Sequence, residues 1–119
     1  MAKNPKKPTM AKSIQRIKTH IPGFDSAVEG GLVKNSLIMV SGGPGSGKTI
    51  FCLQYIYNGI LSSNEPGLII TFDENAESLK ADARIFGWDF DQLERKKQCV
   101  FLSFKPYESG NMQKEIANI

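Results

Sequence analysis

The sequence predicts an α/β fold with a mainly parallel sheet. A short apolar segment, residues 37–41, leads directly into a glycine-rich loop, and apolar residues recur at helical spacing after the loop. Two further apolar segments, 68–72 and 99–104, have the length and the β-branched content of buried strands. Helical segments separate the three expected strands from one another, as the crossovers between parallel strands require.

Length and composition indicate at most one globular domain. The chain has 119 residues, of which 40% are hydrophobic and 23% charged, so it can bury a core. No apolar run approaches the length of a membrane span, and the N-terminus lacks the apolar region of a secretory signal. Cys52 and Cys99 form no metal or redox motif, which favours buried free thiols. Together these features predict a cytoplasmic protein without a membrane partner.

The positive charge is concentrated at the N-terminus. The net charge is +3, yet residues 21–119 hold twelve acidic and nine basic side chains. The six basic residues before them are Lys3, Lys6, Lys7, Lys12, Arg16 and Lys18. We therefore expect a basic flexible arm, residues 1–19, before a domain that spans 20–119. The arm is either a solvated terminus, which its prolines and lack of apolar residues favour, or a contact for DNA or an acidic partner through residues 1–18.

The glycine-rich loop, residues 42–49, fits the Walker A pattern G-x-x-x-x-G-K-S/T between a strand and a helix. Backbone N–H groups at a helix N-terminus bind phosphate, and glycines let the loop curl around it. Lys48 is expected to reach the β- and γ-phosphates, and the Thr49 hydroxyl to ligate Mg²⁺. A turn that merely joined a strand to a helix would have no need of this lysine and threonine. The predicted nucleotide-binding residues are Gly43, Pro44, Gly45, Ser46, Gly47, Lys48, Thr49 and Ile50.

The elements on either side of the loop follow from local signals. Before it, Asp25 or Ser26 is expected to cap a short helical turn that ends at Gly30-Gly31. After it, a helix from about Ile50 to Leu61 is apolar nearly all round, which predicts that it is covered on more than one side.

Two helical segments lie between the second and third expected strands. Asn75 is a plausible N-cap for the first, and Gly87 ends it. Asp89, with Gln92 three residues later, predicts a second short helix that reaches about Lys96. From Lys105 onward a polar tail offers little for a core.

An acidic pair, Asp73 and Glu74, directly follows the strand 68–72. Ligands of open α/β sheets bind at the carboxyl ends of the strands, which is the edge where the glycine-rich loop lies. A carboxylate there can orient and deprotonate the water that attacks a γ-phosphate. Alternatively, the pair is a polar turn or stabilises the N-terminus of the next helix. Spacing alone favours neither interpretation.

Several blocks, in the right order, resemble the KaiC-like ATPases of the RecA/RadA superfamily. They are Gly23-Phe24-Asp25 with Gly30-Gly31-Leu32, the loop from Ser41 to Thr49, Gln54 to Ile60, Glu65 to Glu74, and Phe86 to Asp89. The resemblance covers about residues 20–104. It implies a RecA-like three-layer α/β/α fold that binds ATP and Mg²⁺, usually as a homo-oligomeric hexamer with ATP between subunits. It also implies that Lys48, Asp73 and Glu74 are catalytic, with Glu74 as the general base, although the family usually has glutamate where this chain has Asp73.

The same resemblance implies a truncated domain, because the family's Walker B strand lies beyond the position where this sequence ends. In the RecA-like sheet two later strands separate the loop strand from the strand that ends at Phe72. We expect both to be missing, which would leave the first two strands with unpaired edges. The resulting expectation is an ATP-binding protein that hydrolyses ATP only if missing segments or a partner complete it.

Two other functions stay open. A P-loop nucleotide kinase would have the same loop, and its strand order would let the first two strands pair directly. Against it, some forty residues precede the loop, and Arg84 and Arg95 are the only arginines after it. A non-catalytic regulatory or DNA-associated ATP-binding remnant would act through the basic arm.

Overall fold

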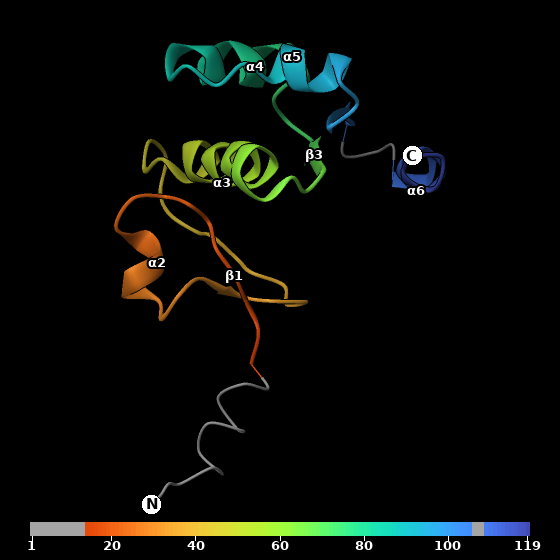
Figure 1. Ribbon diagram of the computed structural model, residues 1–119. Helices are drawn as coiled ribbons and strands as arrows, with labels where there is room; N and C mark the ends of the chain where they lie inside the picture. Colours follow the sequence, from red (N-terminus) through yellow and green to blue (C-terminus); the bar gives the residue numbers. More distant parts are fainter. Residues whose placement is uncertain (1–13, 106–108) are drawn as a thin grey trace, which may run out of the picture.

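The elements alternate between strands and helices along most of the chain (Figure 1). The computed structural model describes residues 14–105 and 109–119. In chain order the elements are β1 (Arg16–Ile17), α2 (Phe24–Ala27), β2 (Leu32–Val33), α3 (Lys48–Ser63), β3 (Gly67–Thr71), α4 (Ala76–Ile85), α5 (Phe90–Arg95), β4 (Cys99–Ser103) and α6 (Ser109–Ala117).

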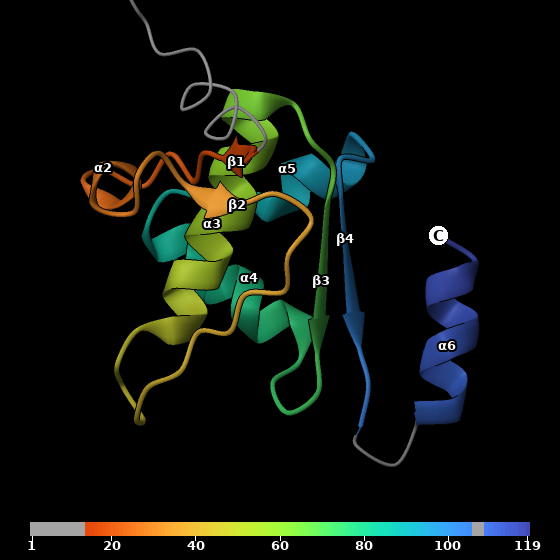
Figure 2. The ribbon, with the colours of Figure 1, turned by 90° about the horizontal axis from the view of Figure 1, so that it is seen from below.

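Strands β3 and β4 form a parallel pair, with α4 and α5 as the crossover between them (Figure 2). Their register runs from Gly67 opposite Cys99 to Thr71 opposite Ser103. The predicted strands 68–72 and 99–104 are thus confirmed to within one residue. Strand β4 pairs with one edge of β3 along its whole length, while no strand among the described residues pairs with the other edge, which agrees with the expected lack of its usual neighbour there.

One core joins α3, α4 and α5 to this strand pair. Its buried members are Leu53, Ile60, Ala83, Phe90, Leu93 and Cys99. Phe90 is fully buried, and the rings of Tyr57 and Phe101 meet it edge to face at centroid distances of 5.4 and 5.3 Å. This packing fixes α3, whose first residues belong to the glycine-rich loop, against the sheet.

Residues 37–41 do not form the predicted buried strand. Leu37 is 99% exposed and Met39 87% exposed. A strand needs a neighbour to pair its backbone groups. Within residues 14–105 and 109–119 the parallel sheet consists of β3 and β4 alone, and neither pairs with this segment. Figure 2 shows the segment as an extended coil that leads from β2 toward α3.

The N-terminal residues that the structure describes are attached to the domain. Strand β1 pairs antiparallel with β2, and Thr19 is fully buried. Residues 1–13 of the expected arm lie outside the described residues, so the arm remains a prediction there. Residues 16–19, however, are structured, so order begins before the expected boundary at residue 20.

Neither Asp25 nor Ser26 caps α2, contrary to the expectation for this turn, because both residues lie within the helix. Gly23 occupies the N-cap position of α2, where no side chain caps the helix. The Asp25 carboxylate instead accepts hydrogen bonds from the backbone N–H and the hydroxyl of Thr19, at 3.0 and 2.6 Å, and from the backbone N–H of His20, at 3.0 Å. Asn58 of α3 donates to the His20 carbonyl at 2.9 Å. These bonds tie the N-terminal segment to α3.

Replacing Asp25 with asparagine should lower the free energy of unfolding by about 1–2 kcal/mol near neutral pH, since it removes a charged acceptor. Partial burial acts to raise the pKa of Asp25, but the hydrogen bonds from Thr19 and His20 outweigh it and lower the pKa from its ordinary value of 3.8. The stabilisation is therefore present above that ordinary value and is lost as the pH falls through the folded-state pKa. Urea unfolding should show the difference between the two proteins narrowing from about pH 7 to about pH 3. If the two proteins differed in free energy of unfolding by the same amount at both pH values, the role of the Asp25 charge would be contradicted.

The helix caps between β3 and β4 are as predicted. The Asn75 side chain accepts from the Ser78 N–H at 2.8 Å, and that of Asp89 accepts from the Gln92 N–H at 3.2 Å. Gly87, with φ +85°, follows the end of α4. Helix α6 was not expected, because its sequence is polar and has no strong capping signal.

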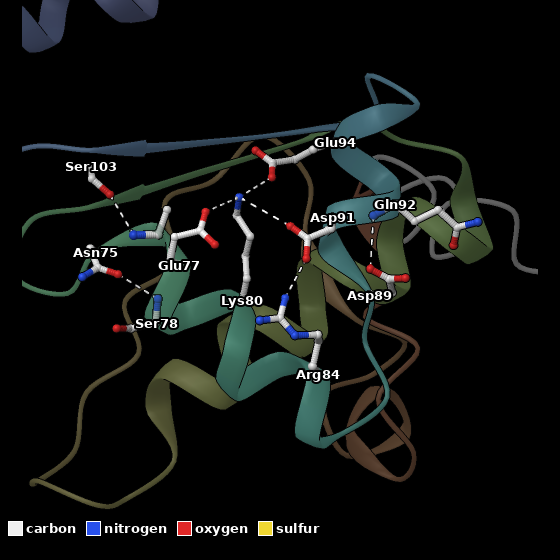
Figure 3. A network of polar contacts seen from close by, with 11 residues as sticks. Asn75, Glu77, Ser78, Lys80, Arg84, Asp89, Asp91, Gln92, Glu94 and Ser103 are labelled. Atoms are coloured by element: carbon white, nitrogen blue, oxygen red, sulfur yellow. Dashed lines mark hydrogen bonds and ion pairs between the residues drawn. The ribbon is translucent and has the colours of Figure 1, made fainter.

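A charged network that the sequence did not predict joins α4 to α5 (Figure 3). Lys80 is only 7% exposed and pairs with Glu94, with Glu77 at 3.3 Å and with Asp91 at 3.8 Å. Burial acts to lower the pKa of Lys80, but the carboxylates of Glu94 and Glu77 outweigh it and raise the pKa. The ion pairs compensate for the burial of the ammonium group.

The two cysteines differ in burial. Cys99 is buried as predicted, and burial, with a contribution from Glu94, raises the pKa of its thiol to about 11. The expectation that Cys52 would be buried is wrong, because it lies on a flank of α3 that borders an open pocket. No helix among the described residues has the length and apolar character needed to cross a membrane.

Candidate nucleotide-binding site

The glycine-rich loop folds back on itself before α3 begins. The Ser46 N–H donates to the Gly43 carbonyl at 3.1 Å. Gly45 and Gly47 have φ values of +78° and +89°, a region that disfavours residues with a side chain. A Cβ on Gly42 would lie 2.4 Å from the Ser46 hydroxyl oxygen. Gly45 and Gly47 are therefore needed for the path of the backbone, and Gly42 leaves room for the Ser46 side chain.

The N-terminus of α3 leaves its first N–H groups available. Gly47 precedes the helix, and no side chain caps it. The Phe51 N–H donates to the Gly47 carbonyl at 2.9 Å as the first bond of the helix. The N–H groups of Lys48, Thr49 and Ile50 therefore have no acceptor within the helix. Together with the positive end of the helix dipole, they fit a phosphate group.

Lys48 bends over the loop. Its ammonium group donates to the Gly43 carbonyl at 3.4 Å, so the charge lies against the backbone that would surround a phosphate. Thr49 is exposed beside it. The part of the chain that the structure describes has no group of three or more His, Cys, Asp or Glu residues that could hold a metal ion. The donor set fits Mg²⁺ that is bound mainly by phosphate oxygens, with the Thr49 hydroxyl as a protein ligand.

A pocket of about 480 Å³ brings Lys48, Thr49 and Glu74 together between α3 and β3. Its lining also includes Val40, residues 68–71 and, from α3, Cys52 and Tyr55. Asp73 does not line it, and neither do residues 43–47. Of the two predicted carboxylates, the structure thus places Glu74 on the same pocket as the lysine and threonine of the loop.

The acidic turn is also held by hydroxyl groups that the sequence analysis did not single out. Thr71 lines the pocket, and its hydroxyl donates to the Glu74 carbonyl at 2.8 Å. The Ser103 hydroxyl accepts from the Ala76 N–H at 3.0 Å. The signal that could have identified both residues is a hydroxyl side chain at the end of each of two parallel strands.

Comparison with known proteins defines the family. A family model described as the ATPase KaiC matches residues 17–119. The chain belongs to the KaiC ATPase family. It is 36% identical, over 101 residues, to a UPF0273 protein of Methanocaldococcus jannaschii, a match that covers 85% of this chain and 42% of that protein. It is 38% identical, over 99 residues, to the circadian clock oscillator protein KaiC of Synechococcus elongatus, with 83% of this chain and 19% of that protein covered.

A solved structure shares the fold of this KaiC-family chain. A KaiC-like protein of the hyperthermophilic archaeon Pyrococcus horikoshii matches with a TM-score of 0.80 and 35% identity, over 88% of this chain and 47% of that one. The predicted RecA-like α/β fold with a parallel sheet is thereby confirmed. The chain spans less than half the length of these relatives.

Proposed function

We propose that this chain binds ATP with Mg²⁺ at residues 43–50 and forms the nucleotide-binding part of a KaiC-type ATPase. The observation that carries the proposal is one pocket that Lys48, Thr49 and Glu74 line together, next to a glycine loop whose backbone fits phosphate. Family membership supports ATP as the nucleotide.

Each group of the site has a role in this proposal. The N–H groups of the loop and of the first turn of α3 hold the phosphates, and Lys48 moves from the Gly43 carbonyl to the β- and γ-phosphates. Mg²⁺, when bound, supplies positive charge that offsets the charge on the phosphate oxygens. Glu74 orients the attacking water and accepts its proton. Asp73 is the second carboxylate of the pair, and it acts from farther away.

Turnover by this chain alone is expected to be low. The match covers less than half of each of these relatives, and the family resemblance implies hexamers with ATP between subunits. We therefore propose that a homo-oligomer, or residues outside the described region, completes the site for hydrolysis.

A titration with fluorescently labelled ATP, with and without Mg²⁺, tests the proposed function. Binding should saturate, and Mg²⁺ should strengthen it, because the Thr49 hydroxyl would help to hold the ion, whose charge would offset that of the phosphates. The absence of saturable binding at millimolar ATP would reject the proposal.

The nucleotide kinase alternative loses its structural support. It depended on direct pairing between the loop strand and the strand 68–72. In the structure β3 pairs with β4 instead, and residues 37–41 pair with neither.

Binding of DNA through the basic arm remains a second proposal. Where the arm meets the domain, Arg16 and Lys18 line a groove with His20 and Lys34, and Glu65 is the one acidic residue among its lining residues. Deleting residues 1–12 should weaken DNA binding and reduce its dependence on salt, since fewer phosphates would be contacted. Unchanged affinity and an unchanged salt slope would dismiss the arm.

We also propose a cytoplasmic location and a domain that follows the arm and, because β1 pairs with β2, begins before the expected boundary at residue 20. The location is supported by the free thiols of Cys52 and Cys99, which are usual in a reducing compartment.

A further inference from the structure

We propose that Thr71 and Ser103 are positioning residues, whose hydroxyl groups hold the turn that carries Glu74 so that this carboxylate faces the phosphate loop. The inference rests on the proposed function and adds two residues to its catalytic arrangement. We call the pair of hydroxyl contacts the strand-end clamp.

The clamp follows from the register of the parallel strands. Thr71 and Ser103 are the last residues of β3 and β4, and they lie directly opposite each other. The Phe104 N–H donates to the Thr71 carbonyl at 2.9 Å, so the pairing continues to this end of the sheet. Both hydroxyls therefore project from the paired ends of the two strands, at the edge where the acidic turn begins.

The two hydroxyls hold the turn at two points, on either side of Asn75. The Thr71 hydroxyl donates to the Glu74 carbonyl at 2.8 Å, and the Ser103 hydroxyl accepts from the Ala76 N–H at 3.0 Å. Figure 3 shows Ser103 beside the start of α4, where the Asn75 side chain caps the helix at Ser78. The backbone of Glu74 is thus fixed to both strands and to α4.

The Ala76 amide makes the clamp measurable. Ala76 is the first residue of α4, so its N–H has no acceptor within the helix. The partner that the structure gives it is the Ser103 hydroxyl on another element. Protection of this amide against hydrogen exchange therefore reports the Ser103 contact rather than helix formation.

The position of the clamp favours a role beyond the stability of the turn. Thr71 lines the same pocket as Lys48, Thr49 and Glu74. Glu74 is exposed, so its side chain is not held by packing, and the clamped backbone is what limits where the carboxylate can reach. A displacement of about 1 Å in a reacting group can cost about a hundredfold in rate.

The test compares Thr71→Val and Ser103→Ala, which remove the hydroxyls, with Thr71→Ser and Ser103→Thr, which keep them. We expect Thr71→Val and Ser103→Ala to lower kcat by at least about tenfold at unchanged affinity for ATP. Thr71→Ser and Ser103→Thr should retain a kcat close to that of the wild type. In protein free of nucleotide, Ser103→Ala should also speed hydrogen exchange of the Ala76 amide. Mg-ATP should shift the carboxyl-carbon NMR resonance of Glu74 in the wild type, and less so in the variants that lack a hydroxyl.

The outcomes separate this inference from the proposed function. If the wild type does not bind Mg-ATP, the proposed function fails, while unchanged Ala76 exchange in Ser103→Ala would overturn the clamp itself. If the wild type binds ATP without measurable turnover, an equal Glu74 shift in all variants overturns the positioning role. If it turns over, an unchanged kcat in Thr71→Val and Ser103→Ala overturns that role, even if the amide exchanges faster.

Discussion

Replacing Lys48 with alanine should weaken the binding of Mg-ATP at least about a hundredfold, because it removes charge-assisted hydrogen bonds to two phosphates that are together worth about 3 kcal/mol. The loss should be specific to binding. Alanine is a strong helix former, and among the described residues this ammonium group makes one hydrogen bond, a long contact of 3.4 Å to the Gly43 carbonyl. Titration with labelled ATP measures the affinity, and circular dichroism should show an unchanged helix content.

Lys96→Ala is the matched control, since it also removes one lysine, but an exposed one at the C-terminal end of α5. Its affinity for Mg-ATP should equal that of the wild type. Equal affinity in the wild type and Lys48→Ala would show that the loop is not the nucleotide site. A similar loss in both variants would show that net charge, rather than the position of Lys48, governs binding.

Local signals predicted the elements whose causes lie within a few residues. The caps at Asn75 and Asp89, the stop at Gly87 and the helix after the glycine loop all have the expected residues in the expected places. Each depends on a backbone group and a side chain that are near in sequence, so the pattern contains the whole interaction.

Three of the features that sequence reasoning missed depend on distant parts of the molecule. Residues 37–41 have the composition of a buried strand, but a strand also needs a neighbour, and none of the described residues supplies one. Lys80 falls at a polar position of α4, yet it is buried because carboxylates of α4 and α5 surround its ammonium group. Cys52 is exposed because the flank of α3 that carries it borders an open pocket, which Val40 of the segment 37–41 also lines.

The candidate site likewise has a part that local sequence predicts and a part that depends on distant residues. The loop and its lysine could be recognised from eight consecutive residues, whereas spacing alone left the acidic pair undecided between catalysis and a polar turn. The packing of β3 against α3 distinguishes the two acids, because it places Glu74 on the pocket of Lys48 and leaves Asp73 off it. Thr71 and Ser103 could not be linked from sequence, since their opposition depends on the register of β3 and β4.

Replacing Glu74 with glutamine should lower the rate of ATP hydrolysis by about 10²–10⁴-fold, which is the usual contribution of a general base. Glutamine has nearly the same size and can still orient a water molecule, but it cannot accept the proton. Affinity for Mg-ATP should stay within about threefold of the wild type, because the loop and Lys48 bind the phosphates. Single-turnover hydrolysis of radiolabelled ATP with protein in excess detects slow turnover.

Asp73→Asn distinguishes a specific base from a general effect of negative charge at this edge of the sheet. It removes the same charge one residue away, from a side chain that does not line the pocket. Its rate should therefore fall much less than that of Glu74→Gln. Equal losses in the two variants would mean that the acidic turn acts through its field alone, and a larger loss in Asp73→Asn would transfer the role of base to Asp73. Full activity in Glu74→Gln would leave the pocket as a binding site whose base comes from elsewhere, such as a neighbouring subunit.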